Sequence, residues 1–267
     1  MKPGFKSALK ALVPPGLQVP VKYWSDRIRG FAEPEMVLLR HIIRKGDRVV
    51  DVGGNRGVYA YHCWKLGAVV EVFEPNPVCL SVLSPWVKGR ERVNLNAVGL
   101  SDHVGSADLH IPIDAAGVEH DASASLERHD FDRERAQAVL LATLDGFGLQ
   151  EVTFLKIDVE GHESRVIQGA KATLANSRPA ILVEIEQRHC ADPINDVFER
   201  ILVLGYLGYY LEGGRLKPIG SFDVRRHQAA GQLGQKDGSY INNFLFLHAS
   251  RCAAAEYPGL EAMCLPR

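Results

Sequence analysis

The sequence has few cysteines, no excess of one charge and no long apolar run. Its five cysteines are scattered, and none belongs to a C-x-x-C pair, so they predict neither a disulfide framework nor a zinc site. The formal net charge is -1, which leaves no general positive field for a nucleic-acid backbone. No apolar run approaches the roughly 20 residues that cross a bilayer. We therefore expect a cytoplasmic protein with no integral membrane segment and no nucleic-acid partner.

Length and composition predict one main α/β domain at residues 31–250. The chain has 267 residues, of which 46% are hydrophobic, and this is enough for a sizeable core. Residues 1–30 are mildly basic and are interrupted by Pro14 and Pro15. We interpret them as an N-terminal arm that docks loosely, in preference to a signal peptide or a membrane contact. Residues 251–267 form a C-terminal tail in this interpretation.

Strand and helix patterns alternate through the middle of the chain, which is typical of a parallel sheet with crossover helices. The predicted strands cover 48–52, 68–77, 91–102, 152–161 and 180–186, and the predicted helices cover 34–46, 57–67 and 162–177. Aromatic-rich runs at 204–220 turn at Gly213 and Gly214, and a last apolar run follows at 240–248. These late runs predict antiparallel strands added to the parallel sheet.

The stretch RVVDVGGNRGVYA predicts a cofactor site. A dinucleotide fingerprint needs glycines spaced G-x-G-x-x-G, but Asn55 and Val58 stand at the second and third positions after Gly53. Asp51 lies at the end of the first strand, and Glu74 ends the second strand at about the 20-residue offset where an acid accepts hydrogen bonds from a ribose. S-adenosylmethionine has an amine and a ribose but no phosphate, so it fits better than NAD. A plain tight turn without a ligand is the alternative.

Together these segments resemble the FkbM-type family of S-adenosylmethionine-dependent methyltransferases. The resemblance runs through GDRVVDVGGNRGVYA, VFEPNP, VNLNAVGLSD, ATLD, FLKIDVEGHESRVIQGA, PAILVEIE and NNFLFL, roughly residues 33–248. It implies a class I, Rossmann-like α/β fold: a seven-stranded, mostly parallel sheet with one antiparallel strand and helices on both faces. The family pattern D-x-G-x-N-x-G is matched residue by residue, although Gly54 stands where the family more often has Ala. The cofactor-binding residues that the resemblance implies are Asp51, Gly53, Asn55, Gly57, Glu74, Asn96 and Ala97.

The stretch KIDVEGHE, at the junction between a strand and a helix, supplies the candidate catalytic residues. They are Lys156, Asp158, Glu160 and His162. A methyl transfer to oxygen needs an acceptor held in line with the methyl group and a base that removes its proton. We predict Asp158 as this base, because it ends an apolar strand at the active edge of the sheet, with Glu160 second. His162 has an alternative role as an exposed residue, and Glu163 as part of the first helical turn.

A divalent metal is a further possibility at the same edge of the sheet. Asp158 together with Glu184 or Glu186 would offer oxygen ligands suited to magnesium or calcium. Neighbouring carboxylates repel one another unless a cation intervenes, and Lys156 already supplies a positive charge. We therefore expect general-base catalysis without a metal, with a metal site as the alternative.

The resemblance implies an O-methyltransferase that acts on a hydroxyl of a sugar, a polysaccharide or a secondary metabolite. The alternatives are an NAD-dependent oxidoreductase and a non-catalytic cofactor-binding module. We predict that the polar stretch 114–137, which follows an edge strand at 106–113, and the loop at 218–239 face a small-molecule or glycan acceptor. Arg225 and Arg226 would meet a phosphate or carboxylate of the acceptor, or else form an ordinary solvated pair.

Overall fold

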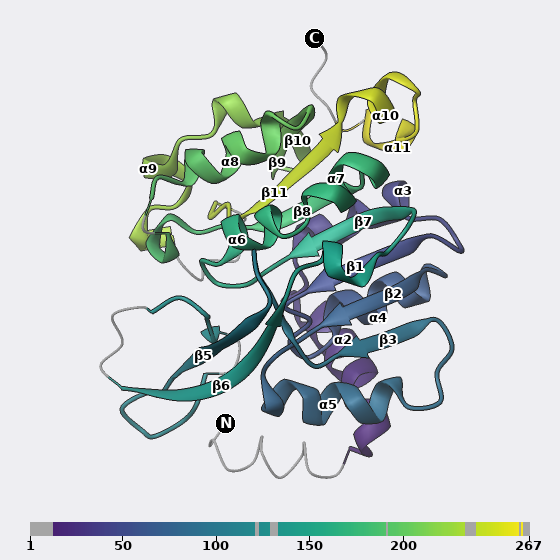
Figure 1. The fold of residues 1–267 in the computed structure, drawn as a ribbon. Coiled ribbons are helices and arrows are strands. Elements are labelled where there is room, and N and C mark those ends of the chain that lie inside the picture. The colour runs from purple at the N-terminus through teal and green to yellow at the C-terminus, as the bar shows by residue number, and fades with distance from the viewer. Residues whose placement is uncertain are drawn as a thin grey trace.

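The computed structural model describes residues 13–120, 123–128, 133–190, 192–232, 239–261 and 263. Its main sheet has eight strands in the order β10-β9-β11-β8-β7-β1-β2-β3, and a second sheet has three strands in the order β4-β6-β5 (Figure 1). The strands of the main sheet are β1 (Arg48–Val52), β2 (Val69–Phe73), β3 (Val93–Asn96), β7 (Val152–Ile157), β8 (Ala180–Glu184), β9 (Tyr206–Glu212), β10 (Arg215–Pro218) and β11 (Asn243–His248). The fold is therefore α/β with a mixed, mostly parallel main sheet.

The resemblance implies a sheet of seven strands with one antiparallel strand. This count is wrong by one, because the main sheet has eight strands. β11 pairs antiparallel with both β8 and β9, and β10 pairs antiparallel with β9. The additional strand is β10, which forms because Gly213 and Gly214, with φ values of +58° and +75°, turn the chain directly back along β9.

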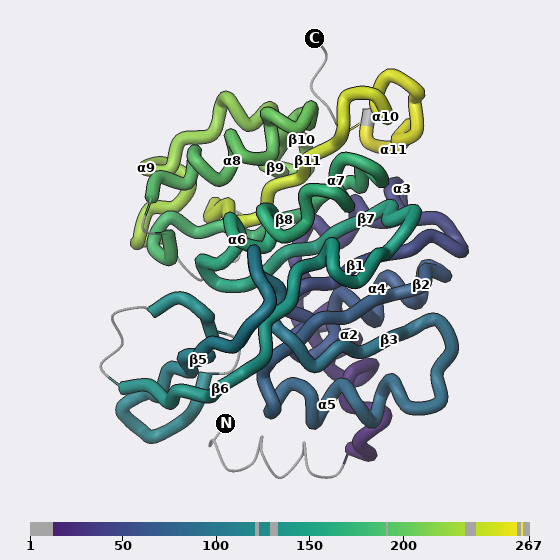
Figure 2. Tube along the Cα trace, in the orientation of Figure 1, coloured from purple at the N-terminus to yellow at the C-terminus, as the bar shows by residue number. Residues whose placement is uncertain are grey.

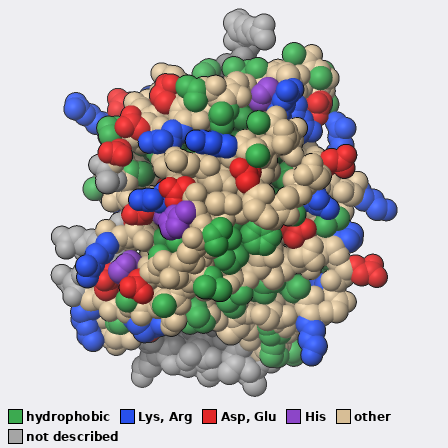
Figure 3. Space-filling model, viewed as in Figure 1, with side chains coloured by type: hydrophobic (Ala, Val, Ile, Leu, Met, Phe, Trp, Pro, Cys, Tyr) green, Lys and Arg blue, Asp and Glu red, His purple; other side chains and the backbone are tan. Residues whose placement is uncertain are grey.

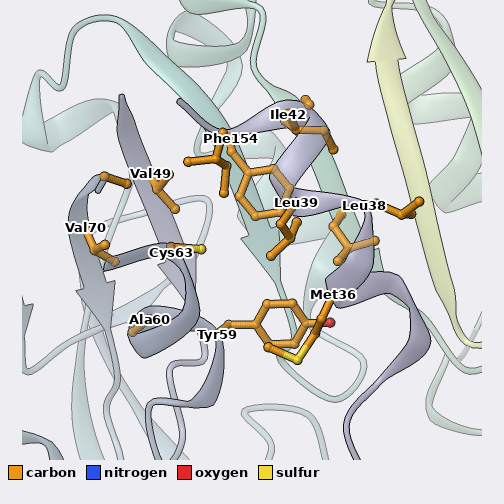
Figure 4. Packing of buried hydrophobic residues seen from close by; sticks show 14 of the residues in the cluster. Met36, Leu38, Leu39, Ile42, Val49, Tyr59, Ala60, Cys63, Val70 and Phe154 are labelled. Atoms are coloured by element: carbon orange, nitrogen blue, oxygen red, sulfur yellow. The ribbon is translucent and has the colours of Figure 1, made fainter. Parts of the chain in front are cut away.

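Helices cover both faces of the main sheet, as the sequence predicts. The α-helices are α2 (Gln18–Arg29), α3 (Leu39–Ile42), α4 (Val58–Lys65), α5 (Pro77–Val87), α6 (Glu163–Gln168), α7 (Lys171–Ser177), α8 (Ile194–Leu202), α9 (Val224–His227), α10 (Ala249–Ala253) and α11 (Pro258–Glu261). Alternate strand residues face opposite cores. Val49 and Phe154 face one core, with Leu39 and Tyr59 from the helical layer (Figure 4). Val50, the next residue on β1, faces the opposite side of the sheet and belongs to the other core, which also contains residues of α6, α7 and α8.

Both ends of the domain pack more tightly than an arm and a tail would. Val19 and Tyr23 on α2 are buried against the layer of α4 and α5, so the expectation of loose docking is wrong for this part of residues 1–30. Residues 1–12 lie outside the described residues. Near the other end, Tyr257 and Leu260 are buried in the same core. No helix in the described parts of the chain is long and apolar enough to cross a membrane.

Two predicted elements are divided where the second sheet meets the domain. The predicted strand 91–102 becomes β3 and the short strand β4 (Gly99–Leu100), and β4 belongs to the second sheet. The predicted helix 162–177 becomes α6 and α7, separated at Gly169. A Cβ atom on Gly169 would lie 1.9 Å from the carbonyl oxygen of Ser101, so the helix break admits the backbone that follows β4. The predicted helix 34–46 is likewise shorter, consisting of a 3₁₀ turn at Pro34–Val37 followed by α3.

The polar stretch 114–137 connects the two strands of a hairpin that stands beside the main sheet, and its last residues begin the second of them (Figure 2). β5 (Gly105–Pro112) and β6 (Glu134–Ala142) pair antiparallel over the whole length of β5, so residues 134–137 are strand and the predicted irregular stretch ends too late. Residues 121–122 and 129–132 lie outside the described part. Residues 123–128 fold back along β5, where the backbone of Ser125 exchanges two hydrogen bonds with His110.

Candidate active site

The glycine loop after β1 lies directly against the turn after β7. Gly53 has a φ of +77°, and a Cβ atom on it would lie 1.9 Å from the carbonyl oxygen of Asp158. Only glycine combines this backbone angle with so close an approach. Asn55 also has a positive φ, +45°, which asparagine tolerates better than most residues. The motif therefore brings the ends of two neighbouring strands into contact.

Glu74, at the end of β2, ties this loop to the sheet. Its side chain is buried, and its two oxygens accept hydrogen bonds from the backbone amides of Asn55 (2.6 Å) and Asn76 (2.7 Å). Burial raises the pKa of Glu74 to about 7, although these two hydrogen bonds oppose the change. The carboxyl group is thus held in place at the wall of a pocket and is sensitive to any cation or donor that binds there.

Asp51 has an unsatisfied oxygen in the interior. It is paired in register with Lys156 of β7 on one side and with β2 on the other. Its Oδ2 atom is buried and has no hydrogen-bond partner among the described residues. Burial raises the pKa of Asp51 to about 7. Because an unpaired buried carboxylate oxygen is costly, this position fits a ligand that brings a positive charge or a donor group.

The pocket between the glycine loop and the second sheet collects many of the predicted residues. It is lined by Val52, Gly53, Asn55, Phe73, Glu74, Pro75, Gly99, Leu100, Leu109, Ala124, Leu126, Asp158, Val159 and Glu160. The apolar wall from β4 and β5 was not predicted, whereas Ala124 and Leu126 belong to the stretch 114–137 that we expect to face the acceptor. The alternation in SADLHIPI predicts that Leu109 lies in a strand, but nothing in the sequence indicates that this strand belongs to a second sheet.

Four predicted cofactor residues lie outside this lining, namely Asp51, Gly57, Asn96 and Ala97. Asn96 donates from its side-chain amide to the carbonyl of Val72, at 3.3 Å, and Ala97 follows it. After Asn96 and Ala97 the chain leaves the main sheet, and Gly99 and Leu100 of β4 line the pocket.

Lys156 is a buried cation among carboxylates. Its Nζ atom lies 3.7 Å from Asp158 Oδ2 and 3.8 Å from Glu184 Oε2, and donates to Asn243 Oδ1 at 3.3 Å. Burial alone would lower the pKa of Lys156, but Asp158 and Glu184, with more distant carboxylates, raise it above its ordinary value. Lys156 therefore remains an ammonium ion and is not a proton carrier near neutral pH.

Several partners of this cluster were not predicted, because they come from segments distant in sequence. The hydroxyl of Tyr59, whose ring lies 5.0 Å from Lys156 Nζ, donates to Glu33 Oε2 at 2.5 Å. Asn243 also donates to Glu33, at 3.2 Å. The side-chain amide of Asn242 donates to Glu184 at 2.6 Å. In the sequence, the two asparagines begin the stretch NNFLFL, and Glu33 directly precedes the predicted helix 34–46.

The surroundings of Asp158, Glu184 and Glu186 show how these possible metal ligands are placed. Among the residues that the structure describes, no group of three His, Cys, Asp or Glu side chains is placed to hold a metal ion. The ammonium of Lys156 lies between Asp158 and Glu184, the two acids named as ligands. Glu186 turns to a different environment, where it accepts hydrogen bonds from Arg188 at 2.6 Å and from Tyr240.

Two members of the predicted catalytic group have other partners. His162 is buried; its Nδ1 atom lies 2.8 Å from Glu127 and its Nε2 atom 3.0 Å from Ser101. It does not line the pocket, so this geometry does not support a role at the reaction centre. Glu160 does line the pocket, and its Oε2 atom lies 2.7 Å from His189 Nδ1. His189 was not predicted, because it lies in a short 3₁₀ turn after β8.

A polar groove begins where Glu160 meets His189. It has a volume of about 460 Å³ and is lined by Glu127, Arg128, Gly161, Ser164, Arg165, Arg188, His189, Cys190, Asp192, Asp196, Val197 and Arg200. Figure 3 shows positive and negative side chains mixed on the face that carries α6 and α8. Of the predicted acceptor-facing residues, Arg226 instead pairs with Glu212 at 3.0 Å, and Arg225 is exposed. This agrees with the alternative of an ordinary basic pair.

A mostly parallel sheet with a glycine loop after β1, a buried acid after β2 and an acidic junction after β7 matches the class I, S-adenosylmethionine-dependent methyltransferase that the sequence resemblance implies. The model of the methyltransferase FkbM domain matches residues 51–211. The chain belongs to this family, which sets aside the alternative of an NAD-dependent oxidoreductase.

Two relatives place the chain further. It is 30% identical over 179 residues to the 2-O-methyltransferase NoeI of Sinorhizobium fredii (strain NBRC 101917 / NGR234), an alignment that covers 57% of this chain and 73% of that protein. The crystal structure of methyltransferase FkbM from Methylobacillus flagellatus KT matches with a TM-score of 0.50 and 14% identity over 91% of this chain. The match covers 58% of that structure, so this chain spans little more than half of its length, and the likeness shows the fold.

Proposed function

We propose that the protein transfers a methyl group from S-adenosylmethionine to a hydroxyl oxygen of a glycan. The observation that carries this proposal is the likeness to a 2-O-methyltransferase over 179 residues, because that name specifies oxygen as the methylated atom. The polar groove beside the pocket supports a glycan, since polyhydroxylated molecules need both donors and acceptors around them.

The residues of the pocket suit a cationic cofactor without phosphates. S-adenosylmethionine, when bound, supplies a methyl group on a sulfonium and leaves as a neutral thioether. Asp51, with its unpartnered oxygen, and the glycine loop would hold the amino-acid end, and Glu74 would accept hydrogen bonds from the ribose. Around them Asp158 and Glu184 face one ammonium, Lys156. Ionisation of the buried acids on binding would give the site a negative charge that complements a cation.

Asp158 is the proposed general base. Its side chain is partly exposed, lines the pocket beside Gly53 and Glu74, and lies 3.7 Å from Lys156. S-adenosylmethionine would supply its methyl group to the acceptor oxygen and leave as the thioether, and a carboxylate oxygen of Asp158 would accept the hydroxyl proton. Lys156 holds this carboxylate in position as a fixed positive neighbour.

The groove at His189 is the proposed acceptor site. Its volume of about 460 Å³ lies in the range of ordinary ligand sites. Glu160 connects the two hollows, since its carboxylate lines the pocket and lies 2.7 Å from His189, which lines the groove. A glycan in the groove would therefore present its hydroxyl at the Glu160 side, close to Asp158.

Mass spectrometry of glycans tests this function directly. Polysaccharides and small glycans are compared between cells that express the wild-type chain and cells that express Asp158→Asn, both grown with methyl-deuterated methionine. We expect a glycan heavier by one labelled methyl group only with the wild type, with the label on oxygen. Label on nitrogen, on carbon or in non-glycan products would contradict the proposed acceptor.

A further inference from the structure

Helix α2 has apolar residues on two opposite sides. Val19 and Tyr23 face the core and are buried. A second row, which we call the outer stripe, consists of Val21, Trp24 and Ile28 together with Leu17, which ends the 3₁₀ turn before α2. Their spacings are four, three and four residues.

The outer stripe is exposed. Leu17, Val21 and Trp24 are 49%, 48% and 46% exposed, and Ile28 is 83% exposed. Spacings of three and four residues place side chains along one side of a helix. A surface helix normally carries polar residues on the side that faces away from its core, so this row needs a second explanation.

Cations surround the outer stripe. Arg27 and Arg29 are exposed on the same helix. Lys65 of α4 extends over the ring of Trp24, with its Nζ atom 4.2 Å from the ring centre. Lys22 pairs with Asp26 at 2.5 Å, and Asp26 is the first acidic residue of the chain, preceded by four lysines. An apolar row with an aromatic residue, bordered by Lys and Arg, is the pattern of a helix that lies in the interface of an anionic bilayer.

Charge also distinguishes between possible occupants of this surface. In a two-fold contact between copies, the same patch meets itself, so Arg27, Arg29 and Lys65 of one copy would approach the like charges of the other. An anionic lipid surface attracts all of these cations at once. We propose that the outer stripe of α2 docks the protein on an anionic membrane surface, with Trp24 at the level of the headgroups.

Sedimentation of the full chain with lipid vesicles tests this proposal. The vesicles contain either phosphatidylcholine alone or phosphatidylcholine mixed with phosphatidylglycerol. We expect binding to the mixed vesicles, little binding to the neutral ones, and release in about 1 M salt, where the Debye length is about 3 Å. The double variant V21S/I28S should bind the mixed vesicles at least about tenfold more weakly than the wild type. The matched control V104S/L140S removes two residues that are 78% and 67% exposed elsewhere, and should bind as the wild type does.

Three results would overturn the proposal. The first is equal binding of V21S/I28S and wild type to the mixed vesicles. The second is a dimer in solution that V21S/I28S converts to monomer, since the stripe would then be a contact between copies. The third is a lower melting temperature for V21S/I28S than for V104S/L140S, since the stripe would then be covered within the chain. S-adenosylhomocysteine affinity is measured alongside, and an unchanged value shows that both variants are folded.

Discussion

At the residue scale, two buried acids beside the glycine loop, Asp51 and Glu74, have the most direct consequences. Asp51 and Glu74 both have pKa values raised to about 7 by burial, so each is partly protonated in the free protein at neutral pH. A bound cation favours the charged form of a carboxyl group. Binding of S-adenosylmethionine should therefore release protons.

We expect the affinity for S-adenosylmethionine to rise as the pH rises through about 7. Between about pH 6 and pH 8, each carboxyl group that must ionise changes the dissociation constant by up to about tenfold. Calorimetry in two buffers with different ionisation enthalpies measures both the affinity and the proton release. An affinity that is constant across this range, without proton release, would show that neither acid interacts with the cofactor.

Glu74→Ala should weaken cofactor binding. The change removes a carboxylate that would accept charge-assisted hydrogen bonds, worth about 1.5–3 kcal/mol or about ten- to a hundredfold in affinity. Calorimetric titration with S-adenosylhomocysteine measures the loss. Glu71→Ala is the matched control, because Glu71 lies on β2 three residues before Glu74, is buried, and accepts a hydrogen bond from Asn94 at 2.9 Å away from the pocket lining. Equal losses in the two variants would make Glu74 a structural residue only.

At the element scale, the contact between the glycine loop and the turn after β7 organises the site. Gly53→Ala should abolish cofactor binding, since the new methyl group would meet the carbonyl oxygen of Asp158 at 1.9 Å and the two elements must separate. Gly89→Ala measures the cost of placing alanine at a positive φ without any steric clash. Gly89 has a similar φ, +73°, with no atom within 4 Å of an added Cβ, so its cost should be about 1–2 kcal/mol.

Urea unfolding and S-adenosylhomocysteine titration compare the two glycine variants. We expect Gly53→Ala to lose more unfolding free energy than Gly89→Ala, because overpacking adds about 1–3 kcal/mol to the backbone strain. If the two variants lose equal free energy and both bind the cofactor, the loop does not depend on this close contact.

The elements that the sequence predicts well are those with a strong local pattern. The apolar runs of β1, β2, β7 and β8 and the motif at Asp51 are visible without any tertiary information. The elements that it predicts poorly depend on contacts between distant segments. The break at Gly169 exists because the backbone at Ser101 passes there, and no local signal marks that approach. The pairing of β4 with β6 rather than with the main sheet is equally non-local.

The same distinction applies to the candidate site. Asp158, Glu160 and Lys156 lie in one motif and were predicted together. Their partners Asn243 and His189 come from later segments, and their roles follow only from the fold, which brings strand ends to one edge of the sheet.

At the scale of the whole molecule, buried acids make the free protein pH-sensitive. The pKa values of Glu35, Asp51, Glu74 and Glu163 are each raised to about 7, in every case mainly by burial. A carboxyl group with a raised pKa in the folded state contributes stability that is fully present below its unfolded pKa of about 4 and is lost as the pH rises through about 7. The charged forms are the ones that burial disfavours.

We expect the unfolding free energy of the free protein to fall between about pH 5 and pH 8. Urea unfolding across this range measures the slope. Saturating S-adenosylmethionine should reduce the slope, because it favours the ionised forms of Asp51 and Glu74 while Glu35 and Glu163 remain as before. A free protein that gains stability over the same range would contradict this account.

We propose that Asp158 removes the proton of an acceptor hydroxyl without a metal ion. The most direct test measures methyl transfer from labelled S-adenosylmethionine to the glycan fraction that mass spectrometry identifies, with wild type and Asp158→Asn, each with and without EDTA. We expect Asp158→Asn to retain cofactor binding and to lose about 10²–10⁴-fold in turnover, and EDTA to have no effect on the wild type. Loss of wild-type activity in EDTA, with recovery on addition of magnesium, would show instead that Asp158 and Glu184 are metal ligands.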